Sequence, residues 1–362
     1  MKEAPLRHGV EYALYLALKG CVRALPHAAT RSFGAAVGWL GHRVDRRHRE
    51  IARRNVSHAF PELAPGARRR LVAACFRHFG GALCDFISAA RFDAVETCRR
   101  FSYEGWEHLD AAERLGRGVF LLGAHHGYWE ISGRPIGLYK GVIHTVARPA
   151  DNPRLERELA RLRARNGYSV IHKRGAARRM LQALRAGERI GILPDQRVRA
   201  NEGIMVPFFG RPASTTPVLA RLSLRSGAPV VPVFAYPRPR GRYHLAIRAP
   251  ILPADVIPAG VTTGDGSSPA GADSAGAESA GAGSAGGNPA GADSAATGSA
   301  RADHPDADPA ETTSDRRDDP AAVALLTRRY LEVIEEEIRR NPEMWLWMHQ
   351  RWEGREKPPS EG

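Results

Sequence analysis

Apolar residues follow two different periodicities along this chain, and the order of the two patterns predicts the fold class. Short apolar runs between positions 118 and 247 alternate with longer stretches in which apolar residues recur every three or four positions. The short runs are typical of buried strands, and the longer stretches are typical of amphipathic helices. Strands that alternate with helices favour an α/β fold with a mostly parallel central sheet flanked by helices. The expected strands are 118–122, 142–147, 169–171, 189–193, 230–234 and 243–247.

Helical patterns fill the spaces between these strands. One helix is expected to begin near Trp129, and another to open at Thr215-Thr216-Pro217, with threonine as its cap and proline in its first turn. The other helices expected between the strands are 152–165 and 176–186.

The first hundred residues carry helical patterns and no strand pattern. Apolar residues recur at helical spacing from 10 to 25, but Glu11, Lys19 and Arg23 interrupt any run long enough to span a bilayer. We expect an amphipathic helix that either packs on the protein's own core or lies in the plane of a membrane. An arginine cluster from 45 to 54 fits either a solvated helix face or a phosphate-rich surface. Further helices are expected at 32–44 and 68–90.

Large apolar residues almost disappear from 258 to 319, where Gly-Ala-Asp-Ser-Ala-Gly repeats take over. Such a segment cannot bury enough surface to offset its ordering entropy, so we expect a disordered insertion. Beyond it, a helix is expected over 321–340, and a tryptophan-rich end over 342–352 should pack on the domain or sit at a membrane interface. The expected divisions are a membrane-associating helical region (1–100), an α/β core (101–257), the insertion (258–319) and a carboxy-terminal part packed on the core (320–362).

Charge is distributed unevenly along the chain. The net charge is +14, yet 258–320 holds 11 acidic and 3 basic residues, a local charge of −8 that leaves +22 on the other 299 residues. The expected folded part is therefore strongly basic. Such a surface suits nucleic acid, anionic lipid or an acidic protein, and composition alone does not choose among them.

The cysteines and the amino terminus bear on the compartment. The chain has four cysteines, at 21, 75, 84 and 98, with neither a Cys-x-x-Cys pair nor zinc-site spacing. Unpaired thiols in a reduced compartment are the expected state. The first residues lack the basic stretch that leads into a signal peptide, so we expect the protein to stay in the cytoplasm.

Candidate chemistry follows the first expected strand, in the stretch 121–130. His125, His126 and Glu130 come directly after the apolar run, and ligands of α/β sheets bind at the carboxyl ends of strands. Three interpretations compete: two loop histidines with Trp129 in the core, a metal site, or a base for acyl transfer. The metal site is the weaker, because His-His lacks the i, i+4 spacing of a helical zinc pair. A histidine with a carboxylate partner can accept a proton near neutral pH without a cofactor.

Several stretches together resemble the lipid A biosynthesis acyltransferase family, within the lysophospholipid acyltransferase group. Its signature, a histidine followed five positions later by an acidic residue, matches His125 and Glu130. His126 and Tyr128 depart from the residues more usual beside that motif. The resemblance implies a glycerolipid-acyltransferase-like fold. Further matches are Asn55-Val56 with Phe60-Pro61-Glu62, Arg148-Pro149, Asp195-Gln196, Pro207 to Gly210, Ala228 to Pro232 and Pro342 to Trp352.

The resemblance also implies roles for individual residues. His125 would deprotonate an acceptor hydroxyl as it attacks an acyl thioester, and Glu130 would hold the imidazole in register. Arg148 would stabilise the oxyanion or bind a phosphate, with a structural salt bridge as the alternative. Asp195 and Gln196 would order the site or bind the acceptor. Phe208 and Phe209 would wall the acyl tunnel or belong to the core. No metal and no cofactor are implied.

The implied partners suit the charge of the chain. The donor would be an acyl carrier protein or acyl-CoA, and the acceptor an anionic glycolipid, a lipid A precursor, at the cytoplasmic face of the cell inner membrane. Phosphatidylinositol mannosides and lysophospholipids are alternative acceptors. An acidic carrier protein and an anionic bilayer would both be attracted to a basic surface.

Two other classes of protein fit the chain less well. A nucleic-acid-binding protein would explain the charge, but no binding motif and no basic stripe interleaved with aromatic residues is present in the sequence, so no nucleic-acid partner is expected. A serine hydrolase would share the α/β class, but the sequence has no Gly-x-Ser-x-Gly.

Two motifs can be laid on the same histidine pair. A His-His-x-x-x-Asp-Gly pattern would make His126 the base, but Glu130 replaces its aspartate and Ile131 its glycine. The lipid A pattern selects His125, and the later motifs support that choice.

Overall fold

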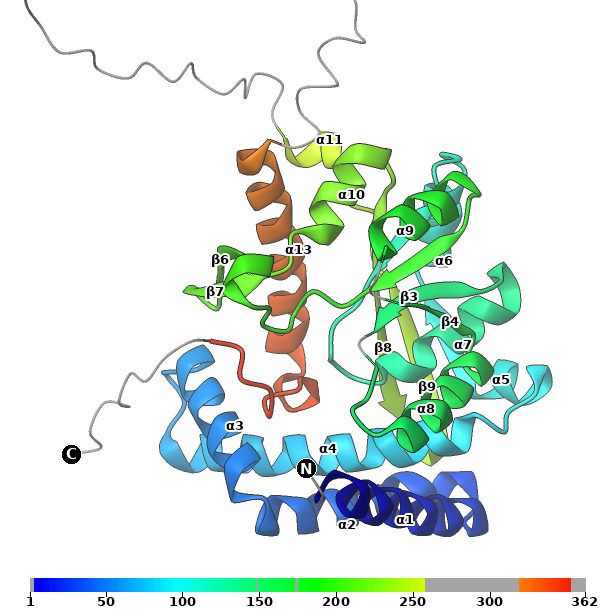
Figure 1. Cartoon of the computed structure of the whole chain (residues 1–362), viewed down its shortest axis with the longest axis vertical. Coiled ribbons are helices and arrows are strands. Elements are labelled where there is room, and N and C mark those ends of the chain that lie inside the picture. Colours follow the sequence, from blue (N-terminus) through cyan, green and yellow to red (C-terminus); the bar gives the residue numbers. More distant parts are fainter. Residues whose placement is uncertain (1–2, 148, 173–174, 258–318, 353–362) are drawn as a thin grey trace, which may run out of the picture.

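A seven-stranded sheet forms the centre of the computed structural model, which describes residues 3–147, 149–172, 175–257 and 319–352 (Figure 1). The strand order is β1-β9-β8-β2-β5-β3-β4. All neighbouring pairs are parallel except β8 and β9. The predicted mostly parallel α/β fold is confirmed. The strands are β1 (Phe101–Glu104), β2 (Val119–Leu122), β3 (Ile143–Ala147), β4 (Tyr168–His172), β5 (Arg189–Ile192), β8 (Val230–Arg238) and β9 (Arg242–Ile247).

Both faces of β2 are buried, as its unbroken apolar run requires. Val119 and Leu121 point into one apolar cluster, and Phe120 and Leu122 point into the other. Successive side chains of a strand alternate between faces, so such a run needs a cover on each side of the sheet. Helices supply both covers. The helices described after the first four are α5 (Ala94–Arg100), α6 (Trp106–Glu113), α7 (Trp129–Lys140), α8 (Pro153–Arg165), α9 (Ala176–Arg185), α10 (Val218–Ser226), α11 (Pro253–Val256) and α13 (Pro320–Arg340).

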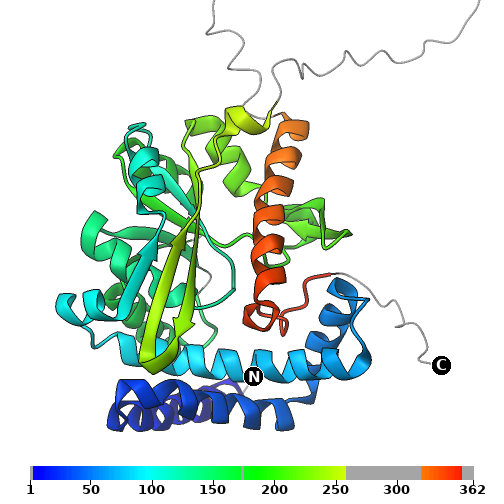
Figure 2. The same cartoon turned by 180° about the vertical axis from the view of Figure 1, so that it is seen from behind.

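Four amino-terminal helices form a layer beside the carboxyl ends of the parallel strands (Figures 1 and 2). Two of them, α2 and α4, pack closely because glycines face each other across the contact. A Cβ on Gly38 would lie 2.1 Å from the carbonyl oxygen of Phe76, and one on Gly80 would lie 2.1 Å from that of Gly34. Only glycine allows the two backbones to come this near. The helices are α1 (Glu3–Ala24), α2 (His27–Val44), α3 (Arg46–Ala59) and α4 (Pro65–Ala89).

Among the described residues, α4 alone is long and apolar enough to cross a membrane by length and composition. Half of its most apolar window is buried inside the molecule. It also reaches the loop after β2, where the His78 ring is bonded to the carbonyl oxygen of Gly127 over 3.1 Å. These contacts are those of a helix packed in the protein's own core.

The structure differs from the sequence analysis at a few elements. Residues 204–215 form an antiparallel hairpin of β6 (Ile204–Phe208) and β7 (Arg211–Thr215), which the sequence analysis does not predict, and the helix expected to open at 215–217 begins later, at Val218. Pro217 takes the cap position of α10, while the Thr216 hydroxyl accepts the N–H of Val218. The strands β8 and β9 are antiparallel because the short turn η2 (Pro239–Gly241) joins them, and a parallel pair needs a long crossover. The remaining short helices are η1 (Ala200–Glu202) and η3 (Pro342–Met344).

The expected insertion, 258–319, lies outside the described residues except for Asp319. The Asp319 carboxylate accepts the N–H of Ala321 and caps α13. One face of α13 is buried, as its helical pattern predicts, and includes Val323, Leu326 and Tyr330.

Candidate active site

His125 and Asp195 meet because their strands are parallel neighbours. The register of β2 and β5 pairs Leu122 with Ile192, and each candidate residue stands three positions beyond its strand. The backbone N–H of His125 donates to Oδ2 of Asp195 over 2.8 Å, and the ring Nδ1 lies 2.9 Å from Oδ1. Two contacts to one carboxylate fix both the loop and the ring.

Asp195 is fully buried, yet it stays ionised. Burial acts to raise its pKa, but the His125 ring, the indole N–H of Trp345 at 2.8 Å and the His125 backbone N–H outweigh burial and lower the pKa to about 2. An ionised carboxylate can only accept hydrogen bonds, so Nδ1 of His125 carries the shared proton. The nitrogen left to accept a proton is Nε2.

Glu130 has a different partner. It lies in the first turn of α7, and Arg163 of α8 binds its carboxylate, with Nη2 at 2.6 Å from Oε1 and Nε at 3.1 Å from Oε2. The expected carboxylate contact to the His125 ring is made by Asp195 instead. Glu130, Arg163 and His125 still line the same cavity. The physical reason is that α7 begins at Trp129, so the helix carries the Glu130 side chain toward α8.

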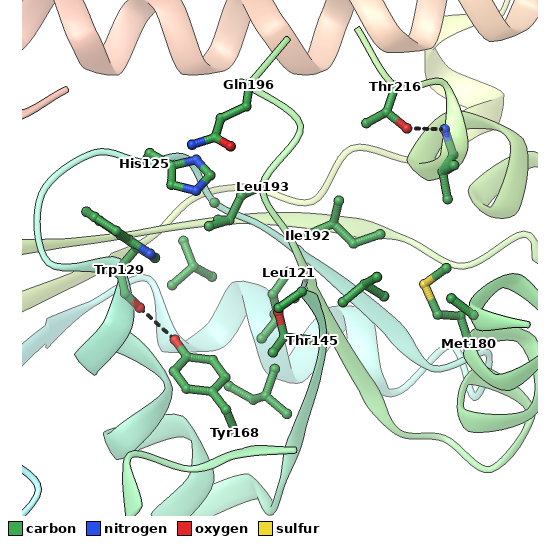
Figure 3. A pocket seen from close by; sticks show the side chains of 18 of the residues that line it. Leu121, His125, Trp129, Thr145, Tyr168, Met180, Ile192, Leu193, Gln196 and Thr216 are labelled. Carbon is green, nitrogen blue, oxygen red and sulfur yellow. Dashed lines mark hydrogen bonds between the residues drawn. The ribbon is translucent and has the colours of Figure 1, made fainter. Parts of the chain in front are cut away.

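The cavity beside His125 has a volume of about 920 Å³ and lies at the carboxyl ends of β2, β3 and β5 (Figure 3). Its walls are mostly apolar, and polar groups are few. The apolar walls include Leu121, Ile136, Ile143, Met180 and Ile192. Pockets of this composition bind apolar molecules and orient them with a few polar groups.

One wall of the cavity is fixed by Tyr168 of β4. Its hydroxyl donates to the carbonyl oxygen of Trp129 over 2.7 Å and accepts the N–H of Gly133 over 2.8 Å. A Cβ on Gly133 would lie 2.5 Å from the Tyr168 ring, so the ring needs a glycine there. The Trp129 ring stands with its centroid 5.3 Å from that of His125. Hydrogen bonds and close packing therefore fix the position of residues beside His125.

Comparison with known proteins identifies the family of the chain. The family model for bacterial lipid A biosynthesis acyltransferases matches residues 2–255 and 306–354, which is most of the chain. The chain belongs to this family. As a member, it is an O-acyltransferase.

Curated relatives of this acyltransferase fall into two groups. It is 29% identical to the lipid A biosynthesis lauroyltransferase of Escherichia coli over 227 residues, 62% of this chain and 74% of the relative. It is 31% identical to the palmitoleoyltransferase of lipid A biosynthesis in the same species over 203 residues, 55% of this chain and 66% of the relative. A phosphatidylinositol mannoside acyltransferase of Mycobacterium tuberculosis is 29% identical over 140 residues, 38% of this chain and 44% of the relative.

Of the other expected site residues, Gln196 lies at the cavity, whereas Phe208 and Phe209 lie in the core. Gln196 lines the cavity with His125. Phe208 and Phe209 are buried and are not among the residues that line the cavity. They pack with the aromatic residues of the carboxy-terminal segment, and the ring centroids of Phe208 and Trp345 are 5.6 Å apart. For these two residues the core role holds. Arg148 lies outside the described residues.

His126 points away from the cavity. It is 1% exposed, and its Nε2 donates to the carbonyl oxygen of Asn341 over 3.2 Å. Burial lowers its pKa to about 4, so it is neutral at physiological pH. No group of three His, Cys, Asp or Glu side chains in the described part of the chain is arranged to hold a metal ion. The geometry favours His125 as the base.

Sequence reasoning missed Arg163 and Trp345 as site residues. Arg163 is one of several arginines in α8, and nothing in the sequence distinguishes it from the others. Trp345 was noticed only as part of an aromatic segment. Both are found through their contacts, to Glu130 and to Asp195 respectively.

Proposed function

We propose that this enzyme moves a fatty acyl chain from an acyl carrier protein thioester to a hydroxyl of a lipid A precursor, as a late step of lipid A biosynthesis. The observation that carries the proposal is the bond between the His125 ring and the buried Asp195 carboxylate beside a large apolar cavity. The family and the two relatives from Escherichia coli support this substrate class.

The proposed reaction is a direct transfer. Nε2 of His125 accepts the proton of the acceptor hydroxyl while the hydroxyl oxygen attacks the thioester carbonyl. Asp195 stabilises the imidazolium through Nδ1 and keeps the ring in the productive orientation. The tetrahedral intermediate then breaks its carbon–sulfur bond, and the departing thiolate takes the proton from the imidazolium. Atoms and charges balance without an acyl-enzyme.

The acyl chain of the donor is assigned to the apolar cavity. Burial of each methylene contributes about 0.8 kcal/mol to binding, so the affinity for a long acyl chain comes mainly from its many methylenes. The His125 ring and the Trp129 ring stand at the polar part of the wall, where the thioester carbonyl would lie. The bound acyl chain itself excludes water from the rest of the cavity.

Glu130 keeps a role in catalysis through Arg163. The two side chains are mostly buried, with exposed fractions of 19% and 16%. Glu130 holds the guanidinium at the cavity wall near the base, where its remaining N–H groups can stabilise negative charge on the carbonyl oxygen or on a substrate phosphate. Gln196 lines the same cavity and is also assigned to substrate binding. Arg148 is retained as an anion-binding candidate on sequence grounds alone.

Membrane association is assigned to the amino-terminal helices at the cytoplasmic face of the inner membrane. Leu6, Val10 and Leu14 are exposed at helical spacing on α1, and Trp39 and Leu40 are exposed on α2. The two helices lie at the same end of the molecule (Figure 2). Exposed apolar side chains on a basic protein favour in-plane binding to anionic lipid.

The helical layer also lies next to the cavity wall. The Lys19 ammonium of α1 is paired with Glu158 of α8, the helix that carries Arg163. We retain the proposed division into a membrane-associating region (1–100), a core (101–257), an insertion (258–319) and a carboxy-terminal part (320–362).

Flotation with anionic liposomes tests the membrane assignment. Binding should weaken as salt rises from about 0.1 M to about 1 M, because the Debye length falls from about 10 Å to about 3 Å. Retention that needs detergent at every salt concentration would show instead that a helix is inserted across the bilayer.

An alternative acceptor has one observation in its favour. The relatives include phosphatidylinositol mannoside acyltransferases, which match a smaller share of the chain. The same base and cavity would serve a hydroxyl on such a glycolipid, or on a lysophospholipid.

Lipid mass spectrometry of cells with and without the protein tests the proposal. A mass step of one acyl residue on a lipid A precursor would support it and give the chain length. A step on a mannoside or a phospholipid would move the assignment to that acceptor. Purified protein with an acyl carrier protein or acyl-CoA donor then identifies the donor. Acyl release to water alone, or salt-sensitive DNA binding without transfer, would overturn the proposal.

A further inference from the structure

The chain after α13 pairs with the loop that carries His125. The N–H of Leu346 donates to the carbonyl oxygen of His125 over 2.9 Å, and the N–H of Gly127 donates to that of Met344 over 2.9 Å. Between these bonds, His126 and Trp345 form an antiparallel bridge. Residues 344–346 therefore bind the loop as a short strand would.

This pairing directs the Trp345 indole at Asp195. Nε1 of Trp345 donates to Oδ2 over 2.8 Å, and both side chains are shielded from solvent, with Trp345 1% exposed. The Trp345 ring packs against the rings of Trp347 and Phe208, with centroid distances of 4.6 Å and 5.6 Å. Because the bond is buried, water cannot replace the indole N–H without opening the core.

We propose that Trp345 is a positioning residue for acyl transfer: its indole N–H holds the Asp195 carboxylate in the orientation and with the charge distribution that the His125 ring requires. The inference rests on the proposed function, because it assigns a role within that site. It also gives the segment beyond the insertion a part in the chemistry, although none of the described residues of that segment lines the cavity.

The physical argument follows the three bonds of the carboxylate. Oδ1 accepts from the His125 ring, while Oδ2 is shared between the His125 backbone N–H and the indole. Each donor withdraws negative charge from the carboxylate. The indole bond is one of the interactions that lower the pKa of Asp195. Without the indole, Oδ2 keeps one donor and the carboxylate attracts the imidazolium more strongly.

Loss of the indole bond should therefore change the base in two ways. The His125 ring should titrate at higher pH, because the imidazolium is stabilised more. It should also be held less rigidly, because the carboxylate has lost one of its anchors. The acid limb of the kcat/KM profile reports the base in the free enzyme and should move in the same direction.

Trp347 offers a matched control two positions away. It is also buried, and its Nε1 donates to the carbonyl oxygen of Pro342 over 2.6 Å. Exchange to phenylalanine removes the same atoms and one indole hydrogen bond at either position. Only the Trp345 bond ends on Asp195, so an effect of lost packing alone should appear in both variants.

The experiment compares the full chain with Trp345→Phe and Trp347→Phe. Thermal unfolding should show similar losses of stability in the two variants. In Trp345→Phe, kcat should fall about 10- to 100-fold at neutral pH with KM little changed, which is the effect of losing a bond to a charged group. The acid limb should move to higher pH. Trp347→Phe should keep the wild-type profile.

Nuclear magnetic resonance separates this inference from the proposed function. With ring-labelled histidine, the His125 signal is assigned by its loss in His125→Gln, and its titration is followed in each protein. A higher midpoint in Trp345→Phe alone supports the inference even if no acyl substrate has been found. An unchanged midpoint in Trp345→Phe, or the same shift in Trp347→Phe, would overturn it. Absence of acyl transfer with every donor would overturn the proposed function instead.

Discussion

Nδ1 of His125 lies 2.9 Å from Oδ1 of Asp195, although the two residues are 70 positions apart in the chain. The contact replaces the local one that the spacing of His125 and Glu130 suggests. It separates the two carboxylates by partner: Asp195 contacts the His125 ring, and Glu130 contacts Arg163.

The base and its carboxylate should each be essential. His125→Ala removes the group that accepts the proton, and Asp195→Asn leaves the ring without an ionised partner. We expect kcat/KM to fall by about 10² to 10⁴ in each case. Circular dichroism should show that His125→Ala is folded. Wild-type turnover by either folded variant would contradict the assignment.

His126→Phe should keep most of the activity. The ring lies between Phe234 and Tyr236, at centroid distances of 6.1 and 6.0 Å, and phenylalanine can occupy that site. The exchange leaves the carbonyl oxygen of Asn341 without this donor, so we expect a loss of stability of about 1–3 kcal/mol. Kinetics and urea unfolding check both parts. A folded but inactive His126→Phe, with His125→Ala still active, would reverse the choice of base.

Glu130 and Arg163 should act as one unit. Glu130→Ala and Arg163→Ala should each impair turnover severely, because each leaves a mostly buried charge without its partner. The double variant should be no worse than the poorer single variant. A double-mutant cycle on kcat/KM measures this coupling. Additive effects would show that Glu130 acts on the reaction independently of Arg163.

The absence of a side chain at Gly191 should leave room for a long acyl chain. It lines the cavity on β5, and a Cβ there would lie 3.4 Å from Cγ2 of Ile143, so alanine can be accommodated by a small adjustment. A leucine side chain would extend into the space assigned to the chain. We expect Gly191→Leu to prefer shorter donors than the wild type, with Gly191→Ala as the matched control. Competition between donors of different length tests this. An unchanged preference in folded Gly191→Leu would move the acyl chain elsewhere.

Buried histidines should make the protein less stable in mild acid. Burial lowers the pKa of His78 and of His126 to about 4 each, whereas an unfolded histidine titrates near a pKa of about 6.5. Between these values the unfolded chain binds more protons, so stability falls as pH falls, by up to about 1.4 kcal/mol per pH unit for each histidine.

Urea unfolding between about pH 7 and about pH 4 measures this slope, with His126→Phe as the control. The variant should lose stability less steeply over the window. Equal slopes in the wild type and the variant would show that His126 is accessible to protons in the folded state.

The sequence by itself determined the fold class, most of the helices and core strands, and the segment that holds His125. The apolar run of β2 has both faces buried, and the helical pattern of α13 buries one face, because each periodicity is a local property of the chain. The motif around His125, together with the ordered later motifs, identified the family correctly.

Only the tertiary structure decided which groups meet His125. Asp195 reaches His125 because β5 lies next to β2 in a register that aligns the residues beyond the two strands, and Trp345 reaches Asp195 because its segment pairs with the loop. The position of Phe208 in the aromatic core also depends on tertiary structure, because its neighbours Trp345 and Trp352 are distant from it in the sequence. No local sequence pattern specifies strand order or register. The spacing of residues in the sequence therefore indicated Glu130 as the carboxylate partner of His125.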